Sequence, residues 1–446
     1  MTETALQTPA FPEGRGDAPV GGNKPSGHEA RKADGHATGN ANGNAAGNPG
    51  GYSGGHPAGQ DCSAGVPEDL TDPLAVAQAL IRQASVTPDP GGAQQVLAAM
   101  LERLGFAVTP LPFGEGAART PNLFARLGTA GPHICYAGHT DVVPPGNEAD
   151  WRVPPYAGTV VDGLLYGRGA CDMKGGIAAF VSAVARLVAR GAPRGSISFL
   201  ITGDEEGPAT YGTCKVLEWM AQNGQIPSYC LVGEPTNPAT LGDMLKIGRR
   251  GSLNAHIVVE GTQGHAAYPH RADNPVHRLL AVLAALRETP LDHGTAYFEP
   301  SSLQITSIDV GNPATNVIPA RAQARLNIRF NDLHTGAALK GWVETTCRSH
   351  APRSTVDVRI SGESFLTQPG PETEQLVAAI TQVTGLVPAL DTGGGTSDAR
   401  FIAQYCPVSE FGLVGASIHK VDEHTPVADL RKLTEIYETF LKGVGM

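Results

Sequence analysis

Acidic residues and histidines recur after five separate segments of the sequence, and these residue types can bind metal ions. They are His139 and Asp141 after HICYAG (133–138), Asp172 after GLLYGRGAC (163–171), Asp204, Glu205 and Glu206 after SISFLIT (196–202), Glu234 after YCLVG (229–233), and His419 after FGLVGASI (411–418). A single acidic residue at such a position usually caps a helix. Converging carboxylates, however, would repel one another and be costly to remove from water unless divalent cations supplied positive charge. Oxygen and nitrogen ligands without cysteine are typical of catalytic zinc, cobalt or manganese.

The number of candidate ligands predicts two ions rather than one. A shared carboxylate can bridge two metal ions about 3.5–4 Å apart, as it does in many hydrolases. The side chains of the adjacent Glu205 and Glu206 diverge, so one can bind metal while the other acts as general base. His139 and Asp141 stand two residues apart, and an imidazole with an orienting carboxylate is a common pair around metals. Asp141 is therefore not required as a ligand.

The elements that must position these residues alternate between strands and helices. HICYAG, SISFLIT and YCLVG are nearly continuous apolar runs, which is typical of buried parallel strands. Helices are expected at LAVAQALIRQ (74–83), AQQVLAAMLERL (93–104), GIAAFVSAVARLVARG (176–191), EQLVAAITQVTG (374–385) and LRKLTEIYETFLKG (430–443). Such alternation predicts an α/β fold, with a mainly parallel sheet covered by helices on both faces. In such sheets ligands bind beyond the carboxyl ends of the strands, where the acidic residues and histidines lie.

A smaller α+β domain interrupts this pattern from about residue 251. Alternating strands are expected at LNAHIVVEG (253–261), SLQITSIDVG (302–311), ARLNIRF (324–330) and TVDVRI (355–360), and helices at HRLLAVLAALRE (277–288) and HTGAALKGWVETTCR (334–348). The expected domains are a catalytic domain formed by residues 67–250 and 363–446, and an inserted domain at 251–362. Residues 1–66 are rich in glycine and asparagine and poor in large apolar side chains, so we expect a disordered tail there.

Composition excludes several classes of protein. The net charge of −10 argues against nucleic-acid binding, which needs a basic surface. No stretch of about 18 apolar residues predicts a membrane span, and the amino terminus shows no secretory signal. The cysteine count of seven is odd and no C-x-x-C motif occurs, which favours free thiols in a reducing cytoplasm.

Five motifs resemble those of the di-zinc amidohydrolases and exopeptidases, a family that includes acetylornithine deacetylase, aminoacylase and succinyl-diaminopimelate desuccinylase. They are GHTDVVP (138–144), GRGACDMKGG (167–176), TGDEEG (202–207), GEP (233–235) and IHKVDE (418–423), and the resemblance spans about residues 70–446. It implies two Zn²⁺ per subunit, with Co²⁺ or Mn²⁺ as substitutes. It assigns the residues as follows: His139 and Glu234 on one zinc, Glu206 and His419 on the other, Asp172 as bridge, Glu205 as general base, and Asp141 as the residue that orients His139.

Within the family, residues 246–277 resemble the desuccinylase members more than acetylornithine deacetylase. This resemblance implies hydrolysis of N-succinyl-LL-2,6-diaminopimelate to succinate and LL-2,6-diaminopimelate, a step of lysine and peptidoglycan biosynthesis. It also implies that the inserted domain is a lid and dimerisation domain. In the resulting homodimer, His265 would reach the neighbouring subunit's site and stabilise the oxyanion. The alternative is acetylornithine deacetylase or another amidohydrolase or peptidase of the family.

The implied substrate carries three carboxylates, so its pocket needs cations or other donors. By resemblance the candidate contacts are Lys246, Arg249, Ser252, Tyr268, Asn316, Arg329, Gly395 and Thr396. The last two lie in GGGTSD, which lacks the lysine of a phosphate loop and is better suited to hold a carboxylate with its backbone. Gly415 stands where members of the family often carry asparagine, so a hydrogen bond to the substrate is expected to be missing there.

Two hypotheses from other functional classes compete with the assignment to this enzyme family. A non-catalytic metal-binding scaffold would not need the free carboxylate of Glu205 beside the ligand Glu206. A nucleotide-binding oxidoreductase is disfavoured because Gly167-Arg-Gly169-Ala-Cys-Asp172 has aspartate where the third glycine of the dinucleotide fingerprint belongs.

Overall fold

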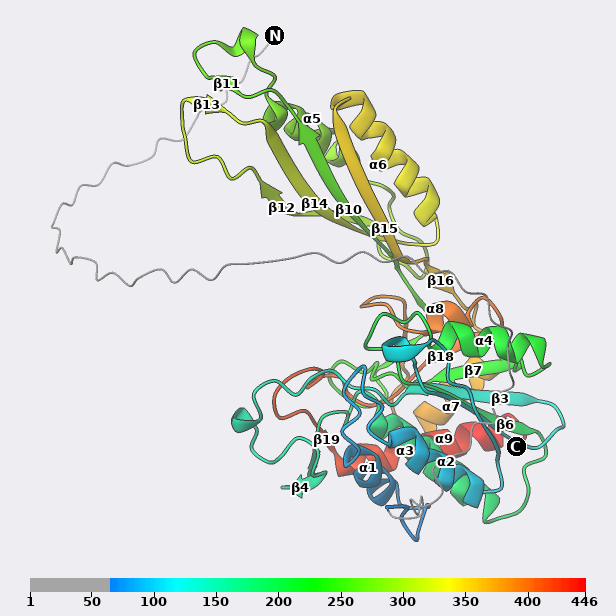
Figure 1. Cartoon of the computed structure of the whole chain (residues 1–446). Helices are drawn as coiled ribbons and strands as arrows, with labels where there is room; N and C mark the ends of the chain where they lie inside the picture. The colour runs from blue at the N-terminus through cyan, green and yellow to red at the C-terminus, as the bar shows by residue number, and fades with distance from the viewer. Residues whose placement is uncertain (1–64) are drawn as a thin grey trace, which may run out of the picture. The chain divides into compact units, whose positions relative to one another are not determined.

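The computed structural model describes residues 65–446, so the tail expected at 1–66 lies almost entirely outside the described residues. The larger sheet has eight strands in the order β1-β2-β6-β3-β7-β18-β8-β17, and Figure 1 labels its central strands β3, β6, β7 and β18. Their bounds are β1 Ala107–Pro110, β2 Asn122–Leu127, β3 His133–His139, β6 Ser196–Thr202, β7 Tyr229–Val232, β8 Met244–Lys246, β17 Ala389–Asp391 and β18 Val408–Glu410. As predicted, β3, β6 and β7 are parallel neighbours. Only β1, β2 and the β8–β18 contact introduce antiparallel pairing.

Helices cover both faces of this sheet. On one face, β3 and β6 pack through residues such as Tyr136 and Phe199 against α1, α2, α3, α7 and α9. On the other face, residues such as Ala137 and Leu200 pack against α4 and α8. The bounds are α1 Pro73–Ile81, α2 Ala93–Arg103, α3 Lys174–Val188, α4 Thr213–Gln222, α7 Pro371–Thr384, α8 Ala399–Ile402 and α9 Val427–Gly443. Because the central strands are apolar on both faces, both layers of helices are needed to bury them.

The register of the central strands brings the predicted metal ligands to one edge. His133–His139 of β3 lies opposite Ser196–Thr202 of β6, so both strands end at the same level. Glu234 follows the end of β7, which pairs with β3 on the other side. The carboxyl ends of the three strands therefore converge on one site.

The inserted domain is built on a four-stranded antiparallel sheet in the order β12-β14-β10-β15 (Figure 1). The strands are β10 Gly251–Glu260, β12 Ser302–Asp309, β14 Arg321–Phe330 and β15 Ser354–Gly362, and the helices are α5 Pro275–Arg287 and α6 Gly336–His350. Alternate residues of β10, such as Leu253 and Ile257, pack with these helices in a second core. The predicted fold class, an α/β domain with a smaller α+β domain, is confirmed.

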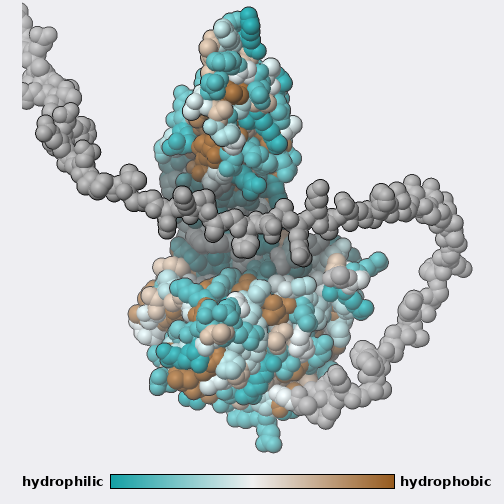
Figure 2. All heavy atoms as spheres, turned by 60° about the vertical axis from the view of Figure 1, so that its left-hand side comes forward, coloured by the Kyte–Doolittle hydropathy of each residue, from teal (hydrophilic) through white to brown (hydrophobic). Residues whose placement is uncertain are grey.

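Short elements complete the described chain. They are β4 Thr159–Val161, β5 Leu164–Tyr166 and β19 His424–Pro426 in one sheet, β11 Gly264–His265 with β13 Val317–Ile318, β9 Gly248–Arg249 with β16 Phe365–Leu366, and the 3-10 turns Gly116–Ala118, Glu148–Asp150 and Pro269–Arg271. Among the described helices, none combines the length and apolarity that crossing a membrane requires. Figure 2 shows a mainly hydrophilic face on which hydrophobic residues form small separate groups.

Candidate metal centre

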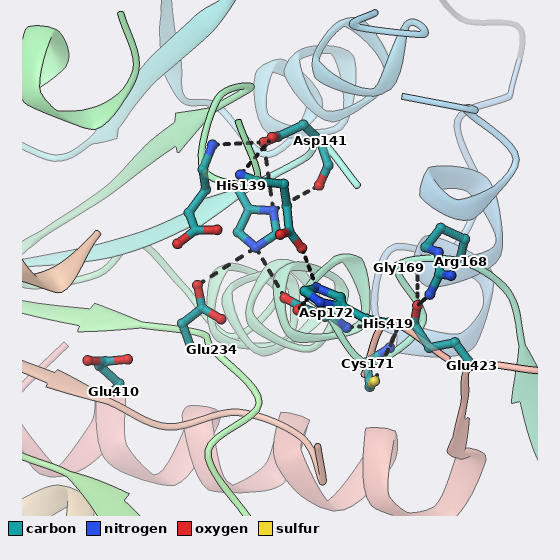
Figure 3. A network of polar contacts seen from close by, with 12 residues as sticks. His139, Asp141, Arg168, Gly169, Cys171, Asp172, Glu234, Glu410, His419 and Glu423 are labelled. Atoms are coloured by element: carbon teal, nitrogen blue, oxygen red, sulfur yellow. Dashed lines mark hydrogen bonds and ion pairs between the residues drawn. The ribbon is translucent and has the colours of Figure 1, made fainter. Parts of the chain in front are cut away.

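Five of the predicted ligands come together at the carboxyl edge of the larger sheet. Their ligand atoms form overlapping groups that could each hold an ion, and within each group the atoms lie within 4.8 Å of one another. The groups are His139 with Asp172 and Glu234, Asp172 with Glu206 and His419, and His139 with Glu205 and Glu206. Figure 3 shows His139, Asp172, Glu234 and His419 turned toward one another.

Asp172 lies between two histidines and presents one oxygen to each. Its Oδ1 is 3.2 Å from Nε2 of His139, and its Oδ2 is 3.2 Å from Nε2 of His419. Glu234 approaches His139 on the first side, at 3.7 Å, and Glu206 approaches His419 on the second, at 2.8 Å. A carboxylate with an imidazole and a second carboxylate on either side has the geometry of a bridge between two cations.

The electrostatics of the cluster fit bound cations. Among the described residues, no lysine or arginine forms an ion pair with Asp172, Glu205, Glu206 or Glu234. Burial raises the pKa of Glu234 well above its ordinary value of 4.5, and the negative charges of Asp172 and Glu205 raise it further. Hydrogen bonds to Asp172 and Glu206 raise the pKa of His419 to about 10. Without metal, protons on these groups offset the negative charge of the carboxylates. Divalent cations would offset the same charge when bound, so the donor set fits two such ions.

Glu205 differs from its neighbour Glu206 in its surroundings. Burial raises the pKa of Glu205 to about 8, and the charges of Asp398, Glu206 and Asp172 add to the shift. No hydrogen bond or ion pair engages its carboxylate within the described chain, whereas Glu206 accepts from His419. A buried carboxylate beside the ligands but not committed to an ion pair has the properties of a general base.

Asp141 contacts both sides of the cluster. Nδ1 of His139 is 2.9 Å from the backbone carbonyl of Asp141 and 3.7 Å from its carboxylate. That carboxylate accepts the backbone N–H groups of Glu205, at 3.3 Å, and Glu206, at 3.0 Å. The contact that orients His139 thus comes mainly from the backbone of Asp141, while its side chain fixes the segment that carries the base.

The cluster also depends on Glu423, for which the sequence had suggested no role. This fully buried carboxylate accepts the backbone N–H groups of Gly169, Cys171 and Asp172 at 3.0–3.1 Å. It also pairs with Arg168 at 2.7 Å (Figure 3). Its position in the motif IHKVDE was the only signal in the sequence. Glu423 therefore holds the loop that presents Asp172.

Two backbone features let the chain deliver its ligands. A Cβ on Gly233, the residue before Glu234, would lie 1.8 Å from the hydroxyl of Tyr136, so only glycine fits there. His419 has φ of +58°, which is rare for a residue with a side chain. Such a conformation persists only where the surrounding structure fixes it, and functional sites are common examples.

The two predicted cationic contacts in the larger domain, Lys246 and Arg249, are already ion-paired. Nζ of Lys246 contacts the carboxylate of Asp391, and Arg249 binds the buried Glu410 through Nε and Nη2. Nη1 of Arg249 donates to the carbonyl of Gly395, 3.2 Å away, next to Thr396. The sequence had identified the cations but not the acidic residues that neutralise them.

The remaining predicted contacts lie in the inserted domain. Ser252 and Arg329 are directly opposite on β10 and β14, and burial and the charge of Arg250 lower the pKa of Arg329. The ring of His265 on β11 is tilted by 60° against that of Tyr268, with ring centroids 5.6 Å apart, and the carbonyl of Asn316 accepts from the backbone N–H of Ala266. Nδ1 of His265 accepts from the backbone N–H of Ala267 at 3.0 Å, and none of the hydrogen bonds of His265 within the described chain joins the metal cluster.

Gly415, which stands where members of the family often carry asparagine, lies close to its neighbours. A Cβ at this position would be 2.7 Å from the side chain of Ile418 and 2.8 Å from the carbonyl of Pro235. A larger residue would need the loop before His419 to shift.

The model of peptidase family M20/M25/M40 matches residues 135–443. The chain belongs to this family. Two similar proteins are each named "Succinyl-diaminopimelate desuccinylase". The one from Gluconacetobacter diazotrophicus is 68% identical over 83% of this chain and 97% of its own length, and the one from Gluconobacter oxydans is 60% identical over 84% and 98%. Among solved structures, the Bacillus subtilis YXEP protein, described as a dinuclear metal-binding M20 peptidase, shares the fold with a TM-score of 0.61 and 16% identity, over 83% of this chain and 97% of that one.

Proposed function

We propose that this M20 chain hydrolyses the succinyl amide of N-succinyl-LL-2,6-diaminopimelate, releasing succinate and LL-2,6-diaminopimelate for lysine and peptidoglycan biosynthesis. The observation that carries the proposal is the cluster around Asp172, with Glu205 beside it. It occurs in a chain that is 68% identical to a relative named for this activity and covers 97% of that relative's length.

We propose two zinc ions as the cofactor, with cobalt or manganese as substitutes. His139 and Glu234 would hold one ion, Glu206 and His419 the other, and Asp172 would contact both. When bound, such a pair of cations polarises the amide carbonyl and lowers the pKa of the attacking water. The YXEP protein, whose description includes two metal ions, supports this count.

The chain's own residues then handle the protons. Glu205 removes a proton from the attacking water and delivers it to the nitrogen of the departing amine, so the C–N bond breaks as a neutral amine leaves. Asp141 keeps His139 and the segment of Glu205 and Glu206 in register through its backbone and side chain. The partner subunit's His265 would donate a hydrogen bond to the oxyanion.

We further propose a homodimer, with residues 251–362 as lid and dimerisation domain between the catalytic segments 67–250 and 363–446. Lys246, Arg249, Ser252, Tyr268, Asn316, Arg329 and the Gly395–Thr396 step remain the proposed substrate contacts. The cytoplasm is the proposed compartment, and the six cysteines of the described chain are thiols there.

The experiment that tests the function compares N-succinyl-LL-2,6-diaminopimelate with N-acetylornithine on the zinc-loaded protein. Turnover of the succinyl substrate alone is expected. Activity on acetylornithine alone would keep the metal site and overturn the substrate, and Gly415 would then be the first position to examine. Inactivity on both substrates with two metals bound would favour a peptidase or a scaffold.

A further inference from the structure

Glu410 is a buried acidic residue next to the metal cluster that the proposed reaction does not use. It ends β18, is 1% exposed, and lies near the metal ligand Glu234 (Figure 3). A buried carboxylate at this position needs a compensating partner, because its charge would otherwise be costly in a low-dielectric surrounding. That partner is Arg249.

The pairing fixes the guanidinium group from two sides. Nε of Arg249 donates to Oε1 of Glu410 at 2.8 Å, and Nη2 donates to Oε2, so the contact is bidentate. Nη1 donates to the carbonyl of Gly395 at 3.2 Å. These contacts use three of the five N–H groups that a guanidinium carries, which leaves two donors in a fixed direction.

The same carboxylate also holds the glycine-rich loop. The hydroxyl of Ser397 donates to Oε1 of Glu410 at 2.9 Å. Gly394, with φ of +92°, brings the loop backbone against Arg249, where a Cβ would lie 3.1 Å from Nη1. Glu410 and Arg249 together therefore hold the Gly395–Thr396 step from both of its ends.

We propose that Glu410 is a positioning residue that, through Arg249 and Ser397, fixes the Gly395–Thr396 step in the shape that receives one carboxylate of the substrate. The inference rests on the proposed function, and it adds a specificity-determining residue that does not itself touch substrate. Because Glu410 neutralises Arg249, recognition at this point depends on the fixed direction of donors rather than on net charge. Loosening the loop should therefore weaken binding while the chemical step stays intact.

The test is steady-state kinetics of Glu410→Gln on N-succinyl-LL-2,6-diaminopimelate, together with metal content. The amide nitrogen of glutamine cannot accept the second bond from Arg249. We expect KM to rise about tenfold, as for the loss of one charge-assisted hydrogen bond, with kcat and the number of bound metals unchanged. A fall in kcat or loss of metal at constant KM would overturn the inference, because Glu410 would then act through Glu234.

Ser397→Ala keeps the test decisive if Glu410→Gln folds poorly. It removes only the hydroxyl donor, and we expect KM to rise about two- to fivefold. Ser409→Ala is the matched control. Ser409 is a buried serine next to Glu410 on β18, and within the described chain its hydroxyl bonds to neither Arg249 nor the glycine-rich loop. Equal changes in both serine variants would overturn the inference.

Failure of the function and failure of the inference give different results. If the parental chain turns over the succinyl substrate but KM is unchanged in Glu410→Gln, only the inference fails. If the parental chain acts on N-acetylornithine instead, the proposed function fails. The same comparison of KM and kcat is then made with that substrate, which also carries a carboxylate.

Discussion

The proposed mechanism gives two adjacent carboxylates of this site separate roles, Glu205 as general base and Glu206 as metal ligand. Glu206 lies 2.8 Å from His419 in the metal cluster, whereas Glu205 is buried beside the ligands without an ion pair of its own. Glu205→Gln keeps the shape of the side chain but removes its ability to take a proton. We expect kcat to fall by about 10²–10⁴, the usual contribution of general-base catalysis, while two metals per chain remain bound. Turnover and elemental analysis of the same sample measure both.

Glu206→Gln is the matched comparison, because it changes the neighbouring residue in the same way. It should lower metal content as well as turnover, since a neutral amide is a weaker ligand than a carboxylate. If Glu205→Gln instead lost metal and Glu206→Gln kept it, the roles of base and ligand would be exchanged.

The sequence could predict most of this site because its residues follow strands that end at one edge. The parallel register of three apolar runs accounts for the convergence of His139, Glu206 and Glu234, whereas the choice of Glu206 rather than its neighbour as ligand rests on the family resemblance. Glu423 and Glu410 could not be assigned in this way. Their partners Arg168 and Arg249 are 255 and 161 positions away in the chain, and only folding brings these charges together.

At the scale of elements, the loop of residues 169–172 is held by a single carboxylate. Glu423 accepts three of its backbone N–H groups and pairs with Arg168, all in the interior. Glu423→Gln should lower the free energy of unfolding by about 3–5 kcal/mol, because it leaves the buried charge of Arg168 without its partner. It should also weaken metal binding through the displacement of Asp172. Denaturant unfolding and metal titration measure the two effects.

Glu260→Gln is the control for that variant. Glu260 on β10 pairs with Arg321 on β14 at 3.7 Å, and the two side chains are 51% and 57% exposed. Water screens such a pair, so the loss should be about 0–1 kcal/mol and metal binding should not change. Similar losses in both variants would mean that Glu423 has no special part in holding the loop.

Elements with a strong local pattern were predicted closely, and those defined by distant pairing were not. SISFLIT matches β6 at both ends, and the expected helix 93–104 differs from α2 by one residue. The strands β8 and β17 have three residues each, too few for a periodic pattern, and they exist because they pair with each other across 145 positions of sequence. Short strands of this kind depend on tertiary contacts that a local pattern does not contain.

For the whole molecule, metal removal should cost more stability as the pH rises. The folded protein holds the pKa of Glu205 at about 8, above its ordinary 4.5, and that of His419 at about 10, above its ordinary 6.5. In both cases the metal-free folded state binds more protons than the unfolded state between these values. The free energy of unfolding of the metal-free protein therefore falls as the pH rises from about 4.5 to about 10.

Bound cations displace those protons and should remove this dependence. The difference in Tm between zinc-loaded and metal-free protein is expected to be larger at pH 8 than at pH 6, and calorimetry on dialysed samples measures it. At free zinc of about 1,000 times Kd the stabilisation should be of the order of 4 kcal/mol. A difference in Tm that does not change with pH would show that the cluster is not the site of the bound metal.

The proposed dimer makes a prediction that no single chain can satisfy. If the partner subunit's His265 completes each site, the His265→Ala and Glu205→Gln chains are inactive alone but complement each other when mixed. In a mixed dimer, the site with intact Glu205 faces a partner with intact His265. Random re-pairing of equal amounts should restore about a quarter of the parental activity, because half of the dimers are mixed and each has one complete site.

A chain that carries both substitutions provides the control for complementation. When it is mixed with the parental chain, each site of the mixed dimer lacks either the base or the histidine, so activity should fall below that expected from dilution. Recovery in the first mixture and loss in the second would place His265 in trans. An inactive first mixture, with dimers present by light scattering, would mean that His265 acts within its own chain or only supports the β11–β13 pair.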